Sequence, residues 1–395
     1  MTRDWRQVTL GDVCEVVNGG TPKTGVPDYW DGDYSWITPA EMGKLASPYV
    51  YETTRTLTDA GLRNSSARLL PPNSVILSSR APIGHLVINT EPMATNQGCK
   101  GLVPRSDLHS KFLYYYLASV VELLNSLGTG ATFKELSGGK LKEVSIALPP
   151  LPEQQRIVAI LDEAFDGIAT AKANAEKNLQ NARALFESQL QSVFSQRGDG
   201  WMVKSLVDLC SLFVDSAHRT PKYQPEGIPA LRPRDVVNGK LAIAEAARVS
   251  EQEYAVQSRR HQPAPGDIVY SRELSFGWAA TLPASPRVCL SQGMCLFRPS
   301  PDVAVPFLLY VLNGPVGRRQ AMRAAVGTAH PHINLGDIKR YRIPFPPLDE
   351  QRRIVGQLDA MAVELERLEA IYQQKLSALE ALKKSLLHQA FSGHL

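Results

Sequence analysis

The chain carries one stretch twice, reading first Pro149-Pro150-Leu151-Pro152-Glu153-Gln154-Gln155-Arg156-Ile157-Val158 and then Pro346-Pro347-Leu348-Asp349-Glu350-Gln351-Arg352-Arg353-Ile354-Val355. The correspondence continues without a gap to Phe194-Ser195, which match Phe391-Ser392. The chain has 395 residues, close to twice the distance between the two copies. The sequence therefore predicts two similar halves, each ending in the same long segment.

The parts between these segments also correspond. Trp5, Leu10, Asp12 and Cys14 have counterparts in Trp201, Leu206, Asp208 and Cys210. Short apolar runs that follow proline- or glycine-containing turns, such as Val75-Ile76-Leu77 and Ile268-Val269-Tyr270, predict buried strands. We expect four segments: a globular domain at 1–148, a helix at 149–197, a second domain at 198–345 and a second helix at 346–395.

The two long segments have the composition of long helices. Residues 153–195 contain no proline and one glycine, and they are rich in Ala, Glu, Gln, Leu and Lys. Apolar residues recur every three or four positions, which predicts a coiled-coil seam. The first seam comprises Ile157, Leu161, Ala164, Ile168, Ala171, Ala175, Asn178, Ala182 and Leu185, and the second comprises Ile354, Leu358, Met361, Leu365, Leu368, Tyr372, Lys375, Leu379, Leu382 and Leu386. Because one seam is mostly alanine and the other mostly large, we expect the helices to pair within one chain, with Asn178 and Lys375 as polar interruptions.

Composition and charge narrow the class of protein. The chain is 44% hydrophobic and 21% charged, as in ordinary globular proteins. The absence of a CxxC pair, of a signal peptide and of a membrane-length apolar run favours a cytoplasmic protein without a membrane partner. Residues 1–148 have no net charge, whereas residues 198–345 carry a net charge of +6, which favours a polyanionic partner.

Common catalytic signatures are missing from the sequence. The three Pro-Pro pairs follow Leu70, Leu148 and Phe345, so there is no [DN]-P-P-[FYW] motif of amino-methyltransferases, and neither a methyl-donor loop nor a phosphate-binding G-x-x-x-x-G-K-[ST] loop occurs. His330-Pro331-His332 could suggest a metal, but no Cys or carboxylate cluster accompanies it, so we favour a loop or a DNA contact there and expect no metal site. These features favour binding over catalysis.

The sequence resembles the specificity subunits of type I restriction-modification systems. The resemblance rests on the repeated L-P-P-L-x-E-Q-x-x-I motif, which starts at Leu148 and, with a phenylalanine in first place, at Phe345. It rests also on the loop Gly19-Gly20-Thr21-Pro22, on Thr95-Asn96-Gln97-Gly98 and on the ending Leu387-His388-Gln389-Ala390-Phe391-Ser392-Gly393. It covers nearly the whole chain, although the second half lacks the G-G-T-P loop.

The resemblance implies an α+β protein in which two mixed α/β target-recognition domains are joined by two long antiparallel helices, with pseudo-twofold symmetry. It implies binding of a bipartite, asymmetric site on double-stranded DNA, in which an unread gap separates the two parts. The two helices, each of about 44 residues or roughly 66 Å, would set the length of this gap. By resemblance the chain has no catalytic residues or cofactor of its own. It would scaffold two modification subunits, which use S-adenosylmethionine, and two restriction subunits, if present, which use ATP and Mg. The alternatives are a self-sufficient DNA modification enzyme and a coiled-coil scaffold without a DNA role.

Base edges are read by forked donors and amides, and phosphates by cations and hydroxyls. Candidate DNA-binding residues of these kinds lie in predicted loops or at strand ends: Thr21, Lys23, Arg80, Asn96, Gln97, Thr132 and Lys134 in the first domain, and Arg232, Arg234, Arg272, Ser291, Gln292, His330 and His332 in the second. For each of them the alternative is a solvated charge or a structural turn. Arg80 and Arg272 are the strongest candidates, because both follow a strand and a serine at matching places in the two halves.

Overall fold

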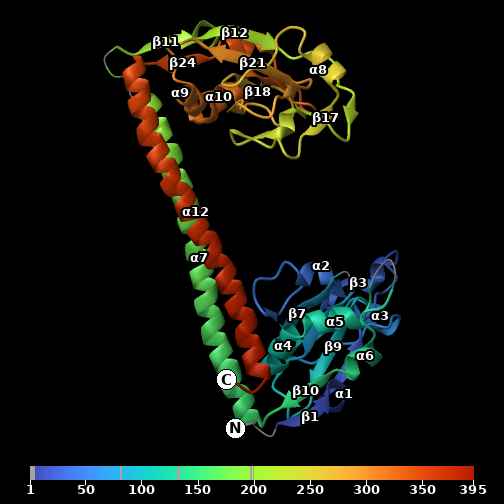
Figure 1. Cartoon of the computed structure of the whole chain (residues 1–395). Coiled ribbons are helices and arrows are strands. Elements are labelled where there is room, and N and C mark those ends of the chain that lie inside the picture. Colours follow the sequence, from blue (N-terminus) through green and yellow to red (C-terminus); the bar gives the residue numbers. More distant parts are fainter. Residues whose placement is uncertain (1–4, 81, 131–133, 196–197, 199) are drawn as a thin grey trace. The chain divides into compact units, whose positions relative to one another are not determined.

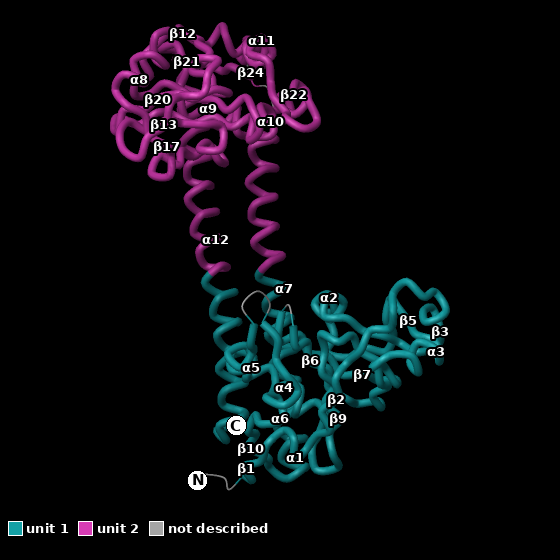
Figure 2. Tube along the Cα trace, turned by 90° about the vertical axis from the view of Figure 1, so that its right-hand side faces the viewer, with its two compact units in different colours: residues 1–175, 374–395 teal, residues 176–373 magenta. Residues whose placement is uncertain are grey.

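The structure is a computed structural model that describes residues 5–80, 82–130, 134–195, 198 and 200–395. It divides into two compact units (Figure 2). Unit 1 comprises Met1–Ala175 and Gln374–Leu395, and unit 2 comprises Glu176–Gln373. Each unit therefore contains one globular domain together with a part of both long helices.

The centre of unit 1 is a five-stranded sheet. Its order is β2-β9-β6-β7-β4, with bounds Cys14–Asn18, Cys99–Pro104, Val75–Ser79, Ile83–Asn89 and Tyr49–Val50. A three-stranded sheet has the order β5-β3-β8, with bounds Thr56–Leu57, Trp30–Ile37 and Met93–Thr95. Strand β1 (Arg6–Thr9) pairs antiparallel with β10 (Ser145–Leu148). The strand predicted at Val75–Leu77 is confirmed as β6, and all five of its residues are buried.

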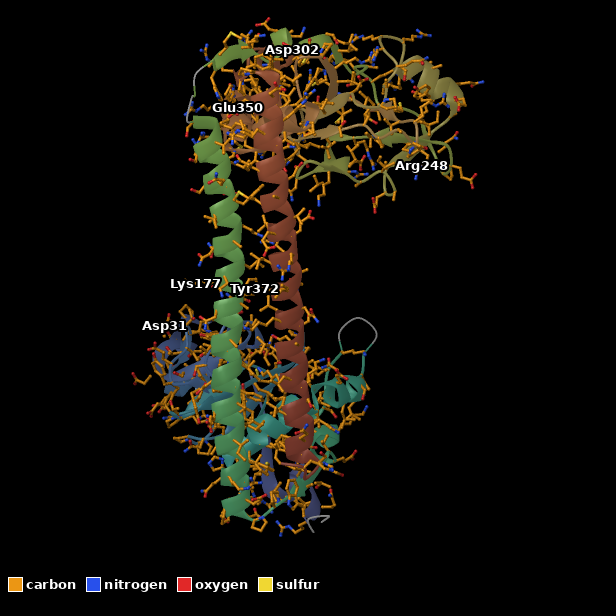
Figure 3. All side chains as sticks on the ribbon, turned by 60° about the vertical axis from the view of Figure 1, so that its left-hand side comes forward. Asp31, Lys177, Arg248, Asp302, Glu350 and Tyr372 are labelled. Atoms are coloured by element: carbon orange, nitrogen blue, oxygen red, sulfur yellow. The ribbon has the colours of Figure 1, made fainter. Side chains whose placement is uncertain are left out.

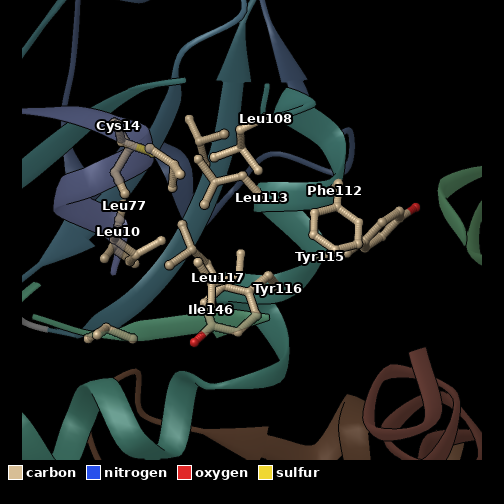
Figure 4. Close-up of a cluster of buried hydrophobic side chains, with 14 of the residues drawn as sticks. Leu10, Cys14, Leu77, Leu108, Phe112, Leu113, Tyr115, Tyr116, Leu117 and Ile146 are labelled. Carbon is tan, nitrogen blue, oxygen red and sulfur yellow. The ribbon is translucent and has the colours of Figure 1, made fainter. Parts of the chain in front are cut away.

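Short helices connect and cover these strands. They are α1 (Leu10–Val13), the 3-10 helix η1 (Pro27–Tyr29), α2 (Pro39–Met42), α3 (Asp59–Arg63), α4 (Ser110–Ser119), α5 (Val121–Leu127) and α6 (Gly138–Lys142). Helix α4 buries Phe112, Leu113 and Leu117 against the sheet, as its amphipathic sequence indicates. Figure 4 shows these side chains beside Leu10 and Ile146 in one continuous core.

Unit 2 repeats this plan with two four-stranded sheets. The first has the order β12-β21-β18-β19, with bounds Cys210–Asp215, Met294–Pro299, Ile268–Ser271 and Ala279–Thr281. The second has the order β13-β17-β14-β20, with bounds Tyr223–Gln224, Ala247–Val249, Ile228–Leu231 and Cys289–Leu290. Three strand pairs complete the described part of the unit: β11 with β24 (Met202–Ser205, Arg342–Phe345), β15 with β16 (Val236–Val237, Lys240–Leu241) and β22 with β23 (Ala325–Val326, His332–Ile333).

The helices within the globular domain of unit 2 are short, as in unit 1. They are η2 (Val207–Leu209), η3 (Pro233–Asp235), α8 (Glu251–Gln257), α9 (Val305–Asn313), α10 (Pro315–Ala324) and α11 (Leu335–Lys339). Short strands and helices therefore alternate in both globular domains, and the α+β class predicted from the sequence is confirmed.

The two long helices are the predicted ones. Helix α7 spans Leu151–Ser195 and helix α12 spans Leu348–Phe391, and Figure 1 shows both as single continuous rods. Helix α12 ends at Phe391, and Gly393 just beyond it has a φ of +77°, the left-handed conformation that commonly follows a helix end. Each helix is anchored in a domain core, α7 through Ile157 and Leu161 in unit 1 and α12 through Ile354 and Leu358 in unit 2.

Within each unit the two helices run antiparallel and contact each other. In unit 1, Arg156 donates to the Leu395 carbonyl at 2.8 Å, and Lys172 pairs with Glu380 at 2.8 Å. In unit 2, Arg183 pairs with Glu369 at 2.7 Å. The prediction that the two helices pair within one chain is confirmed, although exposed ion pairs such as these contribute only about 0.2–1 kcal/mol each.

The predicted seam is correct in its first half and only partly correct in its second, where Ala182, Leu379 and Leu386 are half-buried but four other members are exposed. Asn178 and Lys375 are exposed, Leu185 is 67% exposed and Leu382 is 47% exposed. Leu179, Phe186 and Leu376 are less exposed and take the inward positions instead. A straight helix has 3.6 residues per turn, so a seam counted with a strict seven-residue repeat drifts off the buried face after three or four turns. Polar residues therefore do not interrupt the seam at these places.

Three phenylalanines of α7 that lie outside the predicted seam are covered by the domain cores. Phe194 is 4% exposed inside the unit 2 core, and Phe186 packs against the same core. Phe165 packs against the unit 1 core, with its ring 5.3 Å from that of Tyr115. The outward-pointing side chains along α7 and α12, such as Lys177 in Figure 3, are instead largely polar.

Candidate nucleic-acid interface

In unit 1, two parallel strands end side by side and open into loops that carry polar residues. Strands β3 and β8 pair through Ile37 and Thr95, and the Asn96 N–H donates to the Ile37 carbonyl at 2.9 Å. The loop that follows β2 joins them, because the Gly20 N–H donates to the Thr95 carbonyl at 2.8 Å. The Gly19-Gly20-Thr21-Pro22 loop and the Asn96-Gln97-Gly98 loop therefore meet at one edge, which we call the unit 1 loop edge.

Three predicted residues form one hydrogen-bonded group at this edge. The Asn96 side-chain amide donates to Thr21 Oγ1 at 3.0 Å, and the Thr21 hydroxyl donates to Gln97 Oε1. Asn96 Oδ1 accepts from the Gly98 N–H at 2.8 Å, which fixes the turn. Gln97 is exposed, so its amide N–H groups face solvent as hydrogen-bond donors.

The two glycines of the loop allow this close approach. A Cβ on Gly19 would lie 1.9 Å from the Asn96 carbonyl oxygen, and a Cβ on Gly20 would lie 2.3 Å from the Ala67 nitrogen. A side chain at Gly19 would push its loop away from Asn96, and one at Gly20 would collide with the Ser66–Ala67 backbone. The Gly-Gly pair therefore has a structural role, because it allows Thr21 to lie beside Asn96.

Basic residues surround the unit 1 loop edge. Arg80 forms a β-bridge with Glu135 and an ion pair at 3.6 Å, and Lys100 lies 3.9 Å from the same carboxylate. Lys23 and Lys134 are exposed. Thr132, the remaining candidate of this domain, lies outside the described residues.

Unit 2 contains the same junction of strand ends. Strands β14 and β20 are parallel and pair through Leu231 and Leu290, and the Ser291 N–H donates to the Leu231 carbonyl at 2.9 Å. The residues that follow, Arg232 and Ser291, correspond in hydrogen-bonding pattern to Thr38 and Asn96 of unit 1. The sequence match between Asn96-Gln97-Gly98 and Ser291-Gln292-Gly293 is therefore a structural match too.

Four of the seven unit 2 candidates line one open hollow. We call it the unit 2 hollow, and it is lined by Thr220, Pro221, Tyr223, Arg232, Pro233, Arg234, Glu273, Leu274, Ser291 and Gln292. Arg234 and Gln292 are exposed, whereas Ser291 is buried and accepts from the Tyr223 hydroxyl at 3.3 Å. The structure thus brings Arg232, Arg234, Ser291 and Gln292 together.

Arg232 is less available than its sequence position suggested. Its guanidinium donates to Asp235 at 2.9 and 3.0 Å, and these bonds raise the pKa of Arg232 above its usual value. The fork that would read a base edge therefore already faces a carboxylate. Of Arg232 and Arg234, the exposed Arg234 is the arginine that is available to a ligand.

Arg272 is buried and ion-paired. Its Nη1 donates to both carboxylate oxygens of Asp215 at 3.0 Å, the residue is 8% exposed, and its Nε has no partner among the described residues. His218 Nε2 lies 3.2 Å from the same carboxylate. A buried pair of this kind serves the local structure, and a direct contact of Arg272 with DNA stays a prediction.

The expectation that Arg80 and Arg272 occupy matching places is wrong. Strand register pairs Ser78 with Cys99 in unit 1 and Ser271 with Met294 in unit 2, so Arg272 corresponds to Ser79. Arg80 lies one residue further on. Because successive residues of a strand point to opposite faces, this slip places the two arginines on different sides.

The histidine candidates lie on a separate hairpin. His330 is exposed, and His332 in β23 forms a β-bridge with Glu273. Among the described residues no group of three or more His, Cys, Asp or Glu could hold a metal ion, and no helix is long and apolar enough to cross a membrane. Glu273 is not among the residues predicted from the sequence. Aligning the two strands on Ser78 and Ser271 would have identified it.

Chemically, each edge presents amides, hydroxyls and cations on short loops held by a rigid sheet. Such groups can donate hydrogen bonds to base edges and to phosphates. The two edges share their backbone arrangement and one glutamine, Gln97 or Gln292, but differ in the polar residue before it, Asn96 or Ser291. They are therefore suited to recognising two different short sequences.

Comparison with known proteins points in the same direction. The sequence model of the family described as "Type I restriction modification DNA specificity domain" matches residues 2–180 and again residues 198–378. The MjaIX type I restriction enzyme specificity subunit of Methanocaldococcus jannaschii is 33% identical over 257 residues, which is 60% of this chain and 59% of that protein. The EcoBI specificity subunit of Escherichia coli is 22% identical over 351 residues, or 82% of this chain and 74% of that protein. In the first of these matches the chain spans less than two thirds of its relative's length.

Two solved structures share the fold. One belongs to a study of complex assembly and conformational transition of a type I R-M system, with a TM-score of 0.80 and 21% identity, covering 99% of this chain and 98% of the other. The second is the HsdS subunit from Thermoanaerobacter tengcongensis, with a TM-score of 0.63 and 20% identity, covering 100% of this chain and 98% of the other. The fold of both units thus agrees with that of these proteins.

Proposed function

Because the chain belongs to the type I restriction modification DNA specificity family, we propose that it selects a bipartite, asymmetric sequence in double-stranded DNA. Each globular domain acts as a target-recognition domain and reads one half of the site. The observation that carries the proposal is the loop edge that recurs in both units with one shared glutamine and otherwise different polar residues. Equal backbones with unequal side chains are what two half-sites of different sequence require.

Phosphate contacts supply most of the affinity and base contacts supply the sequence preference. In unit 1 we assign phosphate contacts to the exposed Lys23 and Lys134 and base contacts to Gln97. In unit 2 we assign them to the exposed Arg234 and Gln292, respectively. The net charge of +6 on residues 198–345 favours this second domain as the stronger anchor.

The chain itself does not catalyse a reaction in this proposal. It carries two modification subunits that methylate adenine with S-adenosylmethionine and, where present, two restriction subunits that use ATP and Mg. The cofactors would be held by those partners. Family membership and the similarity to proteins named as specificity subunits support this division of labour.

The proposal is tested by mapping adenine methylation across a genome that carries this chain with its cognate modification subunit. We expect a bipartite motif with two specified parts and an unspecified gap, and its disappearance when the chain is deleted. The purified chain alone should transfer no methyl groups. Methylation by the isolated chain, or methylation that persists without it, would contradict the proposal.

A second experiment tests whether the helices set the gap. Seven residues inserted into both α7 and α12 keep the inward face in phase and lengthen each helix by about 10 Å. At about 3.4 Å per base pair this corresponds to a gap longer by roughly three base pairs. An unchanged gap in the methylated motif would exclude the spacer role.

A further inference from the structure

Glu273 occupies in unit 2 the position that Arg80 holds in unit 1. The Ser79 N–H donates to the Gly98 carbonyl at 2.8 Å, and the Arg272 N–H donates to the Gly293 carbonyl at the same distance. One residue further on, Arg80 bridges to Glu135 and Glu273 bridges to His332. Equivalent positions at the two loop edges therefore carry opposite charges.

The Glu273 carboxylate faces the unit 2 hollow, and the backbone is shaped to admit it. Gly293 has a φ of +81°, and a Cβ at that residue would lie 2.8 Å from Glu273 Oε2. The absence of a side chain at Gly293 thus leaves room for the carboxylate beside the Gln292 loop. The same loop supplies the exposed Gln292 amide to the hollow.

Within the described part of the chain, no side chain pairs with the Glu273 carboxylate. Arg232, one of the two arginines that line the hollow, donates two guanidinium hydrogen bonds to Asp235 instead. Glu273 is partly exposed and therefore keeps its acceptor oxygens for a ligand. In a domain with a net charge of +6 that we propose binds a polyanion, a free carboxylate in the hollow opposes non-specific binding.

The residue after Glu273 is strained and exposed. Leu274 has a φ of +56°, a conformation unfavourable for a non-glycine residue, and it is 60% exposed. The Leu274 N–H donates to the Pro331 carbonyl at 2.9 Å, which holds the strained turn in place. Strain of this kind collects at binding sites, where the surrounding structure fixes a side chain in a required direction.

We infer that Glu273 is a specificity-determining residue that accepts a hydrogen bond from the N4 amino group of a cytosine in the half-site read by unit 2. This inference rests on the function proposed above. A carboxylate only accepts, and in the major groove cytosine presents an amino donor without the adjacent N7 acceptor that adenine would set against the carboxylate. Thymine and guanine present acceptors at the corresponding place, so Glu273 repels both.

The test compares methylation motifs produced by the full chain with its cognate modification subunit. Glu273→Gln keeps the size of the side chain but removes its charge and adds a donor. Glu245→Gln is the matched control, because it removes one negative charge from an exposed residue of the same domain that does not line the hollow. We expect Glu273→Gln to relax or change one C·G position in a single half-site, while the other half-site and the control motif stay the same.

Binding to duplex probes then measures directly whether Glu273 interacts with that C·G pair. In probes carrying the mapped motif, replacing that C·G pair by T·A should weaken binding of the wild-type complex about tenfold. The same replacement should weaken binding of the Glu273→Gln complex by less than about twofold.

Three outcomes decide the matter. An unchanged motif with Glu273→Gln, or a change in the half-site read by unit 1, overturns the inference while the proposed function stands. A wild-type complex that yields no bipartite motif overturns the proposed function, and the inference falls with it. Equal penalties for the T·A probe in wild type and variant show that Glu273 does not read that base pair.

Discussion

Gln154 and Gln351 hold the same place in the two units, and each side chain makes the same three hydrogen bonds. The Gln154 amide donates to the carbonyls of Asp107 and Pro149, both at 2.9 Å, and its Oε1 accepts from the His109 N–H at 2.8 Å. The side chain is fully buried. It therefore ties the first turn of α7 to the loop that precedes α4.

Gln351 repeats this pattern at the start of α12. Its amide donates to the carbonyls of Asp302 at 3.1 Å and Pro346 at 2.9 Å, and its Oε1 accepts from the Ala304 N–H at 2.8 Å. It too is fully buried. The glutamine of the repeated motif is thus a structural clamp, which explains its recurrence without a role in recognition.

We expect Gln154→Ala to destabilise unit 1 by about 3 kcal/mol, because it leaves buried backbone carbonyls and an N–H without partners. Gln155→Ala is the control, since its neighbouring side chain is exposed on the same helical turn. Urea unfolding followed by circular dichroism measures both. Equal midpoints for the two variants would show that the clamp contributes nothing.

Arg272→Ala should destabilise unit 2 by about 3–5 kcal/mol, because Asp215 would keep a buried charge without its partner. The same variant is expected to weaken binding at the unit 2 half-site only. A double replacement, Asp215→Leu with Arg272→Met, removes both charges and should recover most of the stability. Thermal unfolding and motif mapping of both variants provide the measurement.

The double variant separates two roles of Arg272. If it restores both stability and the wild-type motif, Arg272 supports the loop and does not read a base. If it restores stability but changes one position of the motif, Arg272 contacts that base. A single variant that is as stable as the wild type would contradict the importance of the buried pair.

The stability of unit 1 should fall on mild acidification because of His109. Burial, with a smaller contribution from Lys111, lowers the pKa of His109 below 6.5, and Asp162 opposes this shift. Its Nδ1 is buried without a partner among the described residues. Below pH 6.5 the unfolded chain therefore binds a proton that the folded state resists, so stability decreases as the pH falls.

Chemical denaturation between pH 7 and pH 5 checks this expectation. His109→Asn should lose part of the pH dependence of the unit 1 transition. The control is His388→Asn, whose histidine is exposed on α12. If His109→Asn follows the wild-type profile over the whole range, the buried histidine is not the titrating group.

Much of the architecture could be predicted because it follows from local signals. The helix composition of residues 153–195 and the Pro-Pro pairs fixed the long helices to within two residues at their starts. Four positions in the second half of the seam were wrong because a small deviation per turn accumulates along a helix of 45 residues. Periodicity therefore places a helix reliably but not its buried face over its whole length.

The candidate interface was harder, because it depends on contacts between distant residues. Thr21 and Asn96 are 75 residues apart and meet only through the packing of three strands. Arg80 and Arg272 were matched by residue type, whereas strand register matches Arg80 with Glu273. A one-residue slip changes the face of a side chain, and a single sequence contains no direct signal for register.

Gln97→Ala and Lys23→Ala should impair DNA binding in different ways. Gln97 is exposed and its amide faces solvent beside Thr21, so its loss should weaken binding of the cognate sequence about tenfold and relax one position of the unit 1 half-site.

Lys23 is also exposed, on the loop that contains Thr21. As a phosphate contact, its loss should weaken binding of all sequences alike and reduce the slope of log affinity against log salt by about one. Fluorescence anisotropy with cognate and scrambled duplexes at several salt concentrations separates the two effects. Identical losses on both duplexes in the Gln97→Ala complex would remove Gln97 from the base-reading residues, and a salt slope unchanged by Lys23→Ala would remove Lys23 from the phosphate contacts.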